Sequence, residues 1–124
     1  KQAVSEATGA FIELRVQPSL SGLWTAVQWR DASRIWYTIE GWQGALESDG
    51  TKTWWLPGTL FGYGPFRWVV YDEPGGDIIS ISESFYLPRS ANRIISMDVL
   101  LSEAVQSRLA EDGRLLQYRS APRE

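Results

Sequence analysis

TKTWWLPGTLFGYGPFRWVVYD (residues 51–72) is the stretch that decides the fold of this chain. It contains two apolar runs, TKTWWL and FRWVVYD, which are rich in the aromatic and β-branched residues favoured in β-strands. Pro57 and Gly58 end the first run, because proline cannot donate a hydrogen bond within a central ladder. FGYGP then forms a corner. The stretch predicts two strands that meet at a turn, and it leaves open whether their rings form a core or a binding surface.

The strand pattern continues on both sides of this stretch. Residues 11–17 (FIELRVQ) alternate with period two, so Ile12, Leu14 and Val16 share one face. Residues 23–29, 35–42 and 77–87 are further apolar runs, and they are separated by turn signals such as Asp49-Gly50. Six or seven short strands between regular turns predict an antiparallel β-sandwich or barrel.

The pattern changes after Pro88. In residues 96–113 (SMDVLLSEAVQSRLAEDG) the apolar side chains recur at helical spacing, which predicts one amphipathic helix. Ser96 can cap its start and Gly113 can end it. We therefore expect a flexible leader over residues 1–10, a sandwich over 11–88, and a helix with a tail over 89–124, packed on the sandwich. The predicted apolar stripe consists of Met97, Leu100, Leu101, Ala104, Val105 and Leu109.

Composition excludes several functions. The 124 residues fit a single domain, and the net charge of −3 gives no electrostatic reason to bind nucleic acid or an anionic membrane. The chain has no histidine and no cysteine, so a Ser-His-Asp triad, a thiol nucleophile and a His- or Cys-bearing zinc site are impossible. No apolar run approaches the roughly 20 residues that cross a bilayer. Its unusual feature is seven tryptophans.

Four features in order link residues 24–88 to a known class of domains: LPGT (residues 56–59), the strand FRWVVYD, the glycine turn at Gly75-Gly76, and a serine-rich last strand that ends at Pro88. In this order they resemble a fibronectin type III or related immunoglobulin-like sandwich, over about half of the chain. The resemblance makes Tyr63 the candidate for the tyrosine that this family places near its E–F corner. It also implies a binding or spacer module without shared catalytic residues, in an extracytoplasmic bacterial protein.

Alternation predicts which rings face the core. Trp29, Trp54, Phe66 and Trp68 are expected inside, together with Ile35, Tyr37, Ile39, Ile79, Ile81 and Phe85. An aromatic outer face is expected from the opposite set, and we predict that it forms the binding site together with two charged neighbours. The predicted site residues are Trp36, Trp42, Trp55, Tyr71, Glu40 and Arg67.

Three explanations for outward-facing tryptophans stay open. The helix can cover them, since its apolar stripe must be buried somewhere. A protein partner or a second copy of the chain can cover them, because tryptophan, tyrosine and arginine dominate interface cores. Alternatively, the rings can stack on carbohydrate, with Glu40, Gln43, Arg67 or Asp49 bonding the hydroxyls.

Two acidic groups could carry chemistry. Glu40, Glu47 and Asp49 could act as the paired carboxylates of a glycosidase, although acidic loops are ordinarily just solvated. Asp72, Glu73 and Asp77 surround a glycine turn and could hold Ca²⁺, although turns favour Asp and Gly for backbone reasons alone. We therefore predict a non-catalytic binding or assembly module without metal or cofactor.

Overall fold

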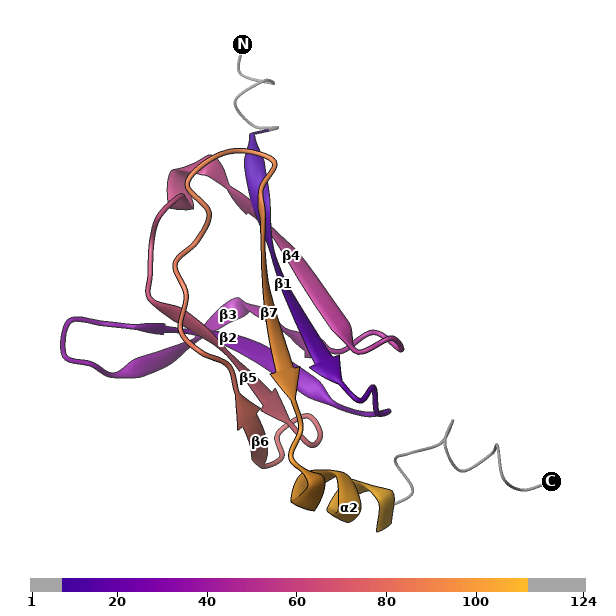
Figure 1. Cartoon of the computed structure of the whole chain (residues 1–124). Helices are drawn as coiled ribbons and strands as arrows, with labels where there is room; N and C mark the ends of the chain where they lie inside the picture. The colour runs from indigo at the N-terminus through magenta and orange to yellow at the C-terminus, as the bar shows by residue number, and fades with distance from the viewer. Residues whose placement is uncertain (1–7, 112–124) are drawn as a thin grey trace.

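Two β-sheets packed face to face form the body of the protein, and one helix lies at an end of it (Figure 1). The structure is a computed structural model that describes residues 8–111. One sheet has the strand order β4-β1-β7 and the other β3-β2-β5-β6. This confirms the predicted β-sandwich with a carboxy-terminal helix. The elements are β1 (Gly9–Gln17), β2 (Trp24–Arg30), β3 (Trp36–Ala45), β4 (Thr51–Pro57), the 3₁₀ turn η1 (Gly58–Leu60), β5 (Phe66–Tyr71), β6 (Ile78–Ile81), β7 (Ile94–Leu100) and α2 (Glu103–Glu111).

The core lies between the inner faces of the two sheets. Ile12 and Leu56 from one sheet and Trp68 from the other are fully buried. Trp54 stacks on Trp68 with ring centroids 5.4 Å apart and planes within 9°. Each such ring removes a large apolar area from water, so this stack contributes much of the contact between the sheets.

One strand pair departs from the predicted antiparallel arrangement. β7 pairs with β1 in parallel, with Leu14 opposite Met97, whereas all other strand pairs of the described residues are antiparallel. The chain between β6 and β7 runs in front of the sandwich and crosses from the four-stranded sheet to the three-stranded one, where β7 lies beside β1 (Figure 1).

The helix prediction was wrong over residues 96–100. Met97 and Val99 lie on β7 and face the core, while Leu100 on the same strand is 75% exposed. Met97 and Leu101 satisfy a strand period as well as a helical one, Val99 fits only the strand, and pairing with β1 favours the strand. The predicted cap Ser96 is therefore a strand residue; its hydroxyl donates to Glu13 Oε1 at 2.7 Å.

α2 begins later than predicted. The Ser102 hydroxyl accepts a hydrogen bond from the backbone N–H of Val105 at 3.2 Å and caps the helix. Leu109 is fully buried in the core cluster, and Arg108 donates to Asp72 at 2.8 Å. These contacts fix α2 beside the β5–β6 turn. The predicted stop at Gly113 and the tail lie outside the described residues, as do residues 1–7 of the predicted leader, whereas Gly9 and Ala10 already belong to β1.

A register shift in β6 corrects one further prediction. The pairing shifts between Val70 and Tyr71, which places Ile81 opposite Val69 on the outer face. Ile81 was expected in the core but is exposed, whereas Ile79 packs against the core and Phe85 is buried, as predicted.

Two leucines of the predicted helical stripe should now behave differently. Replacing Leu109 by alanine should lower the free energy of unfolding by about 2–5 kcal/mol, because the change leaves a cavity in the core. Replacing Leu100 should change it by less than about 0.5 kcal/mol, because its side chain is already in water. Urea unfolding followed by tryptophan fluorescence measures both values. Equal losses would contradict the strand assignment of Leu100.

Candidate functional site

An apolar pocket of about 540 Å³ opens at one edge of the sandwich. β3 and β4, which contribute to its walls, are the outermost strands of their respective sheets. The pocket therefore lies where the two layers part and where no further strand closes the gap between them. We call it the aromatic pocket. Its lining consists of Trp29 from β2, Ile39 and Trp42 from β3, Trp55 and Pro57 from β4, Leu60 from η1, Tyr63, and Phe66 from β5.

A β-bulge in β3 places Trp42 in this pocket. Thr38 pairs with Gln28 and Gln43 pairs with Ala26, so the four residues 39–42 lie opposite Val27 alone. The bulge reverses the alternation of β3. Ile39 and Trp42 both pack against the core, and Trp42 lies 5.9 Å from Phe66 between ring centroids. The prediction that Trp42 faces outward with Trp36 was therefore wrong.

The expected inward positions of Ile35 and Tyr37 are also corrected. Tyr37 pairs with Trp29 and shares its side of the sheet, as predicted, but 48% of Tyr37 is exposed. The β2–β3 hairpin extends past the edge of the facing sheet, so this side chain has no partner layer (Figure 1). Ile35, at the end of the hairpin turn, is exposed for the same reason.

Trp55 borders the aromatic pocket from the outer side of β4. It follows the inward-facing Trp54, and 45% of it is exposed, as the alternation predicted. Its indole lies over Gly9 of β1, where an added Cβ would clash with the ring and with the Leu56 carbonyl oxygen. Only glycine leaves room for this indole position.

The Gly9 contact predicts a specific cost. Replacing Gly9 by alanine should lower the free energy of unfolding by about 1–3 kcal/mol, because both the indole and the backbone must move. The matched control is Gly41→Ala in the β3 bulge, where an added Cβ meets nothing within 4 Å. That change should be close to neutral. Thermal unfolding with the Trp55 indole signal followed by NMR tests both, and equal effects would contradict the close approach of Trp55 to Gly9.

The walls of the aromatic pocket carry no charge. Among the described residues that line it, there is no carboxylate, amide, lysine or arginine; the only polar side-chain groups are indole N–H groups and the Tyr63 hydroxyl. Pockets for small ligands combine apolar walls with a few placed polar groups. The lining of the aromatic pocket is almost entirely apolar, so the pocket suits an aliphatic or aromatic group.

Three other predicted site residues lie on the outer face of the four-stranded sheet. Arg67 stacks on the Trp36 ring at 4.2 Å from its centroid and donates through Nε to Gln28 Oε1 at 2.8 Å. Burial lowers the pKa of the Arg67 guanidinium. Arg30 also approaches the Trp36 ring, at 5.6 Å. Tyr71 pairs with Trp24 further along this face. Trp36 is thus covered by two cations, which is a stabilising arrangement in its own right.

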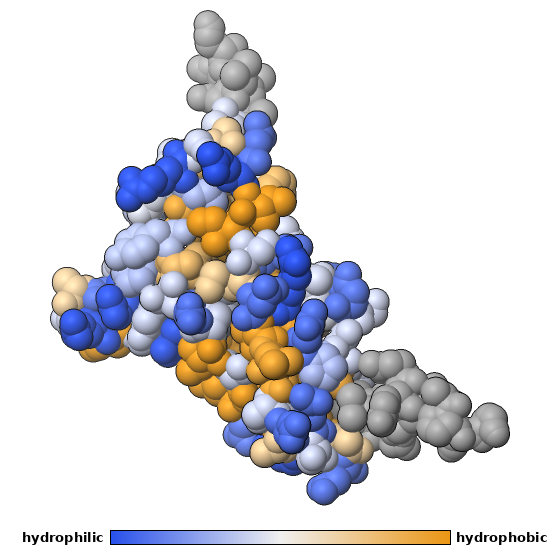
Figure 2. All heavy atoms as spheres, in the orientation of Figure 1, coloured by the Kyte–Doolittle hydropathy of each residue, from blue (hydrophilic) through white to orange (hydrophobic). Residues whose placement is uncertain are grey.

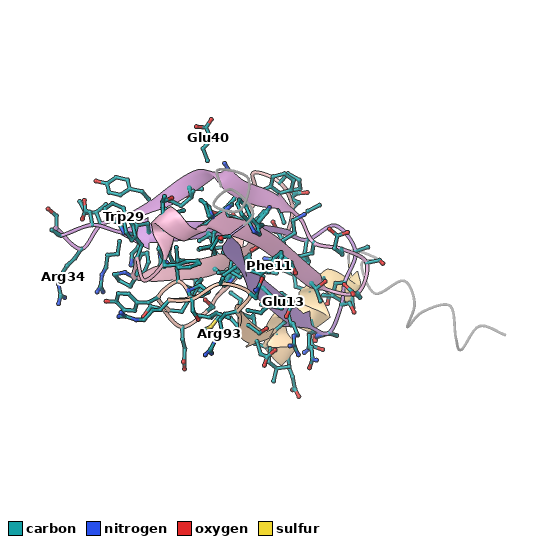
Figure 3. The ribbon with its side chains drawn as sticks, turned by 90° about the horizontal axis from the view of Figure 1, so that it is seen from above. Phe11, Glu13, Trp29, Arg34, Glu40 and Arg93 are labelled. Atoms are coloured by element: carbon teal, nitrogen blue, oxygen red, sulfur yellow. The ribbon has the colours of Figure 1, made fainter. Side chains whose placement is uncertain are left out.

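Glu40 completes the predicted set and is separate from both surfaces. It lies within the β3 bulge, is exposed, and points away from the body in Figure 3. The structure therefore brings together Trp42 and Trp55 at the aromatic pocket, and it does not bring Glu40 or Arg67 to them.

The acidic groups around Glu47 and Asp49 have structural partners. Glu47 pairs with Lys52 at 3.4 Å, and Asp49 accepts hydrogen bonds from the Thr51 hydroxyl and N–H, which lower the pKa of Asp49. Neither carboxylate lines the aromatic pocket. The pairing of carboxylates that a glycosidase needs is therefore not formed at this pocket.

The predicted calcium turn is also occupied by protein contacts. Asp72 accepts hydrogen bonds from the N–H of Asp77 and from Arg108, and the Gly76 N–H bonds to the Glu73 carbonyl. Within residues 8–111 no three acidic, histidine or cysteine side chains gather in a way that could hold a metal. The turn is built from the backbone preferences of Asp and Gly.

α2 does not cover the aromatic pocket. Its one buried side chain, Leu109, and its ion pair with Asp72 lie beside the β5–β6 turn, and none of its residues lines the pocket. The described part of the helix therefore does not cover the tryptophans at this pocket, which was one of the three explanations that the sequence left open.

No family model matches the chain, and neither the curated proteins nor the solved structures contain a significantly similar one. Within the described part of the chain, no helix has the length and hydrophobicity needed to cross a membrane.

Proposed function

We propose that this domain is a non-catalytic binding module, and that the aromatic pocket receives an apolar side chain from a protein partner. The observation that carries the proposal is the uncharged lining of a 540 Å³ pocket that stays open at the sandwich edge. Buried aromatic or aliphatic anchors in such pockets supply most of the affinity of protein interfaces. Trp42, Trp55 and Phe66 provide walls of this kind.

The lining favours a protein side chain over a sugar. A sugar ring can stack on an indole, but its hydroxyls need hydrogen-bonding partners, and burying them without partners costs free energy. Glu40 and Arg67, which were expected to supply those partners, lie away from the pocket. An aliphatic or phenyl group has no such requirement.

The strand edges beside the pocket favour side-chain insertion over strand addition. Edge strands attract other strands unless they are blunted. β3 carries the bulge, Pro57 of β4 has no N–H, and the Lys52 side chain lies over the inward-facing Trp54 ring, 5.6 Å from its centroid. These features leave little free edge for pairing with another strand, so the pocket itself must provide most of the recognition.

The immunoglobulin-like relationship stays a proposal with one supporting observation. In that architecture strands B and E share one sheet while C, F and G share the other. β1 and β4 share one sheet and β2, β5 and β6 share the other in the same chain order. β7 then occupies the position of strand A beside β1, although it runs parallel to β1.

The proposal is tested with small mimics of an apolar side chain. N-acetyl-phenylalaninamide and N-acetyl-leucinamide should shift the indole N–H signals of Trp42 and Trp55 in a saturable manner, while cellohexaose and laminarihexaose should not. Tyr63→Ala, at an exposed wall, should weaken the response to the amides about tenfold, because a wall of the pocket is lost. Tyr37→Ala is the matched control, since Tyr37 is equally exposed but does not line the pocket.

Two outcomes would overturn this proposal. A saturable response to the oligosaccharides without one to the amides would identify a carbohydrate module. If neither the amides nor the oligosaccharides shift the indole N–H signals, in the wild type or in Tyr63→Ala, the pocket binds neither class of compound. Light scattering then tests one kind of protein partner: twice the chain mass identifies a second copy, and a monomeric mass excludes it.

A further inference from the structure

A second pocket of about 440 Å³ lies in the crossover between β6 and β7, and its chemistry is opposite to that of the aromatic pocket. Arg89 and Arg93 both line it, together with the Ser90 hydroxyl, the Tyr86 ring and Ile94. We call it the arginine pocket. In Figure 2 hydrophobic and hydrophilic side chains lie next to one another on the face that shows this crossover.

Among the described residues, the two guanidinium groups have no counter-charge. No acidic side chain is among the described residues that line the pocket, and within residues 8–111 neither arginine has an ion-pair or side-chain hydrogen-bond partner. Among the described residues, Arg15 pairs with Glu13 and Arg108 with Asp72, whereas Arg89 and Arg93 make no ion pair. In a chain with a net charge of −3, two such cations at one hollow make a locally positive surface.

Hydrogen bonds fix the backbone at and beside both arginines. The Gly62 N–H bonds to the Pro88 carbonyl at 3.0 Å, directly before Arg89. On the other side, the Phe11 N–H bonds to the Arg93 carbonyl at 2.9 Å, and the Asn92 N–H bonds to the Gly9 carbonyl at 2.8 Å. Such anchoring reduces the ordering cost of binding a ligand.

We propose that the arginine pocket binds an organic oxyanion, with a carboxylate or a phosphate group between Arg89 and Arg93. Guanidinium groups recognise both through paired, charge-assisted hydrogen bonds, and Ser90 can donate a further one. The carbon part of the ligand lies against Tyr86 and Ile94, which are both exposed at the pocket. This site is independent of the aromatic pocket and needs no particular partner there.

Calorimetric titration with phenyl phosphate, phenylacetate and benzyl alcohol tests the proposal. The two anions should bind and the neutral alcohol should not, and the ratio of the two anion affinities tells whether phosphate or carboxylate is preferred. Arg89→Gln and Arg93→Gln should each weaken anion binding about ten- to hundredfold, as expected for a hydrogen bond between charged groups. Both side chains are exposed, so the fold should survive, and circular dichroism checks this.

The matched control is Arg34→Gln. Arg34 lies at the tip of the β2–β3 hairpin, away from the body in Figure 3, and does not line the arginine pocket. The Arg34→Gln substitution removes the same charge and should leave the affinity for the anions within about twofold of the wild-type value. Tyr63→Ala should also leave anion binding unchanged, which keeps this test separate from that of the aromatic pocket. Absence of saturable anion binding, or an equal loss in Arg34→Gln, would overturn the proposal.

Discussion

The bulge in β3 is the constraint on which the candidate site depends. Four residues, 39–42, occupy the length that Val27 alone occupies on β2. Because side chains alternate along a strand, the shift reverses which face the following residues take. Ile39 keeps its inward position and Glu40 stays outside, but Trp42 turns inward, and the strand becomes a poor template for another chain. One local irregularity thus creates a wall of the aromatic pocket and protects the edge beside it.

The sequence was sufficient for the strands and insufficient for this bulge. Alternation in residues 11–17 and the β-rich run at 66–71 are local signals, and both segments are strands in the structure. The bulge has no comparable signal, since Gly41 within IEGW marks it only weakly. The predicted start of the helix was wrong for a similar reason. Apolar residues at 97, 101 and 105 fit a helical period, and only the pairing with β1, which is distant in sequence, makes the first of these residues part of strand β7.

The candidate site was predicted in part. Trp42 and Trp55 were singled out as exposed aromatic residues, and both reach the aromatic pocket, but Trp42 does so from the inner face. Leu60 was not singled out, because a leucine after a Pro-Gly pair carries no signal of its own. Trp29 and Phe66 were assigned to the core on correct grounds, since they do face inward. What the sequence could not show is that the layers part at the β3 and β4 edges and leave these core-facing rings accessible.

The two pockets share a structural support. The Leu87 N–H bonds to the Tyr63 carbonyl at 2.8 Å, and the bridge between Phe66 and Phe85 continues this pairing. Gly64 is necessary here, since an added Cβ would come within 2.6 Å of the Tyr86 ring. Tyr63 lines the aromatic pocket, whereas Tyr86 and Arg89 line the arginine pocket. The same short backbone pairing therefore positions the uncharged wall of the aromatic pocket and the cationic wall of the arginine pocket. A substitution that loosens this pairing must alter both pockets. The two pockets share this backbone support, so the difference between their ligand preferences comes from their side chains alone.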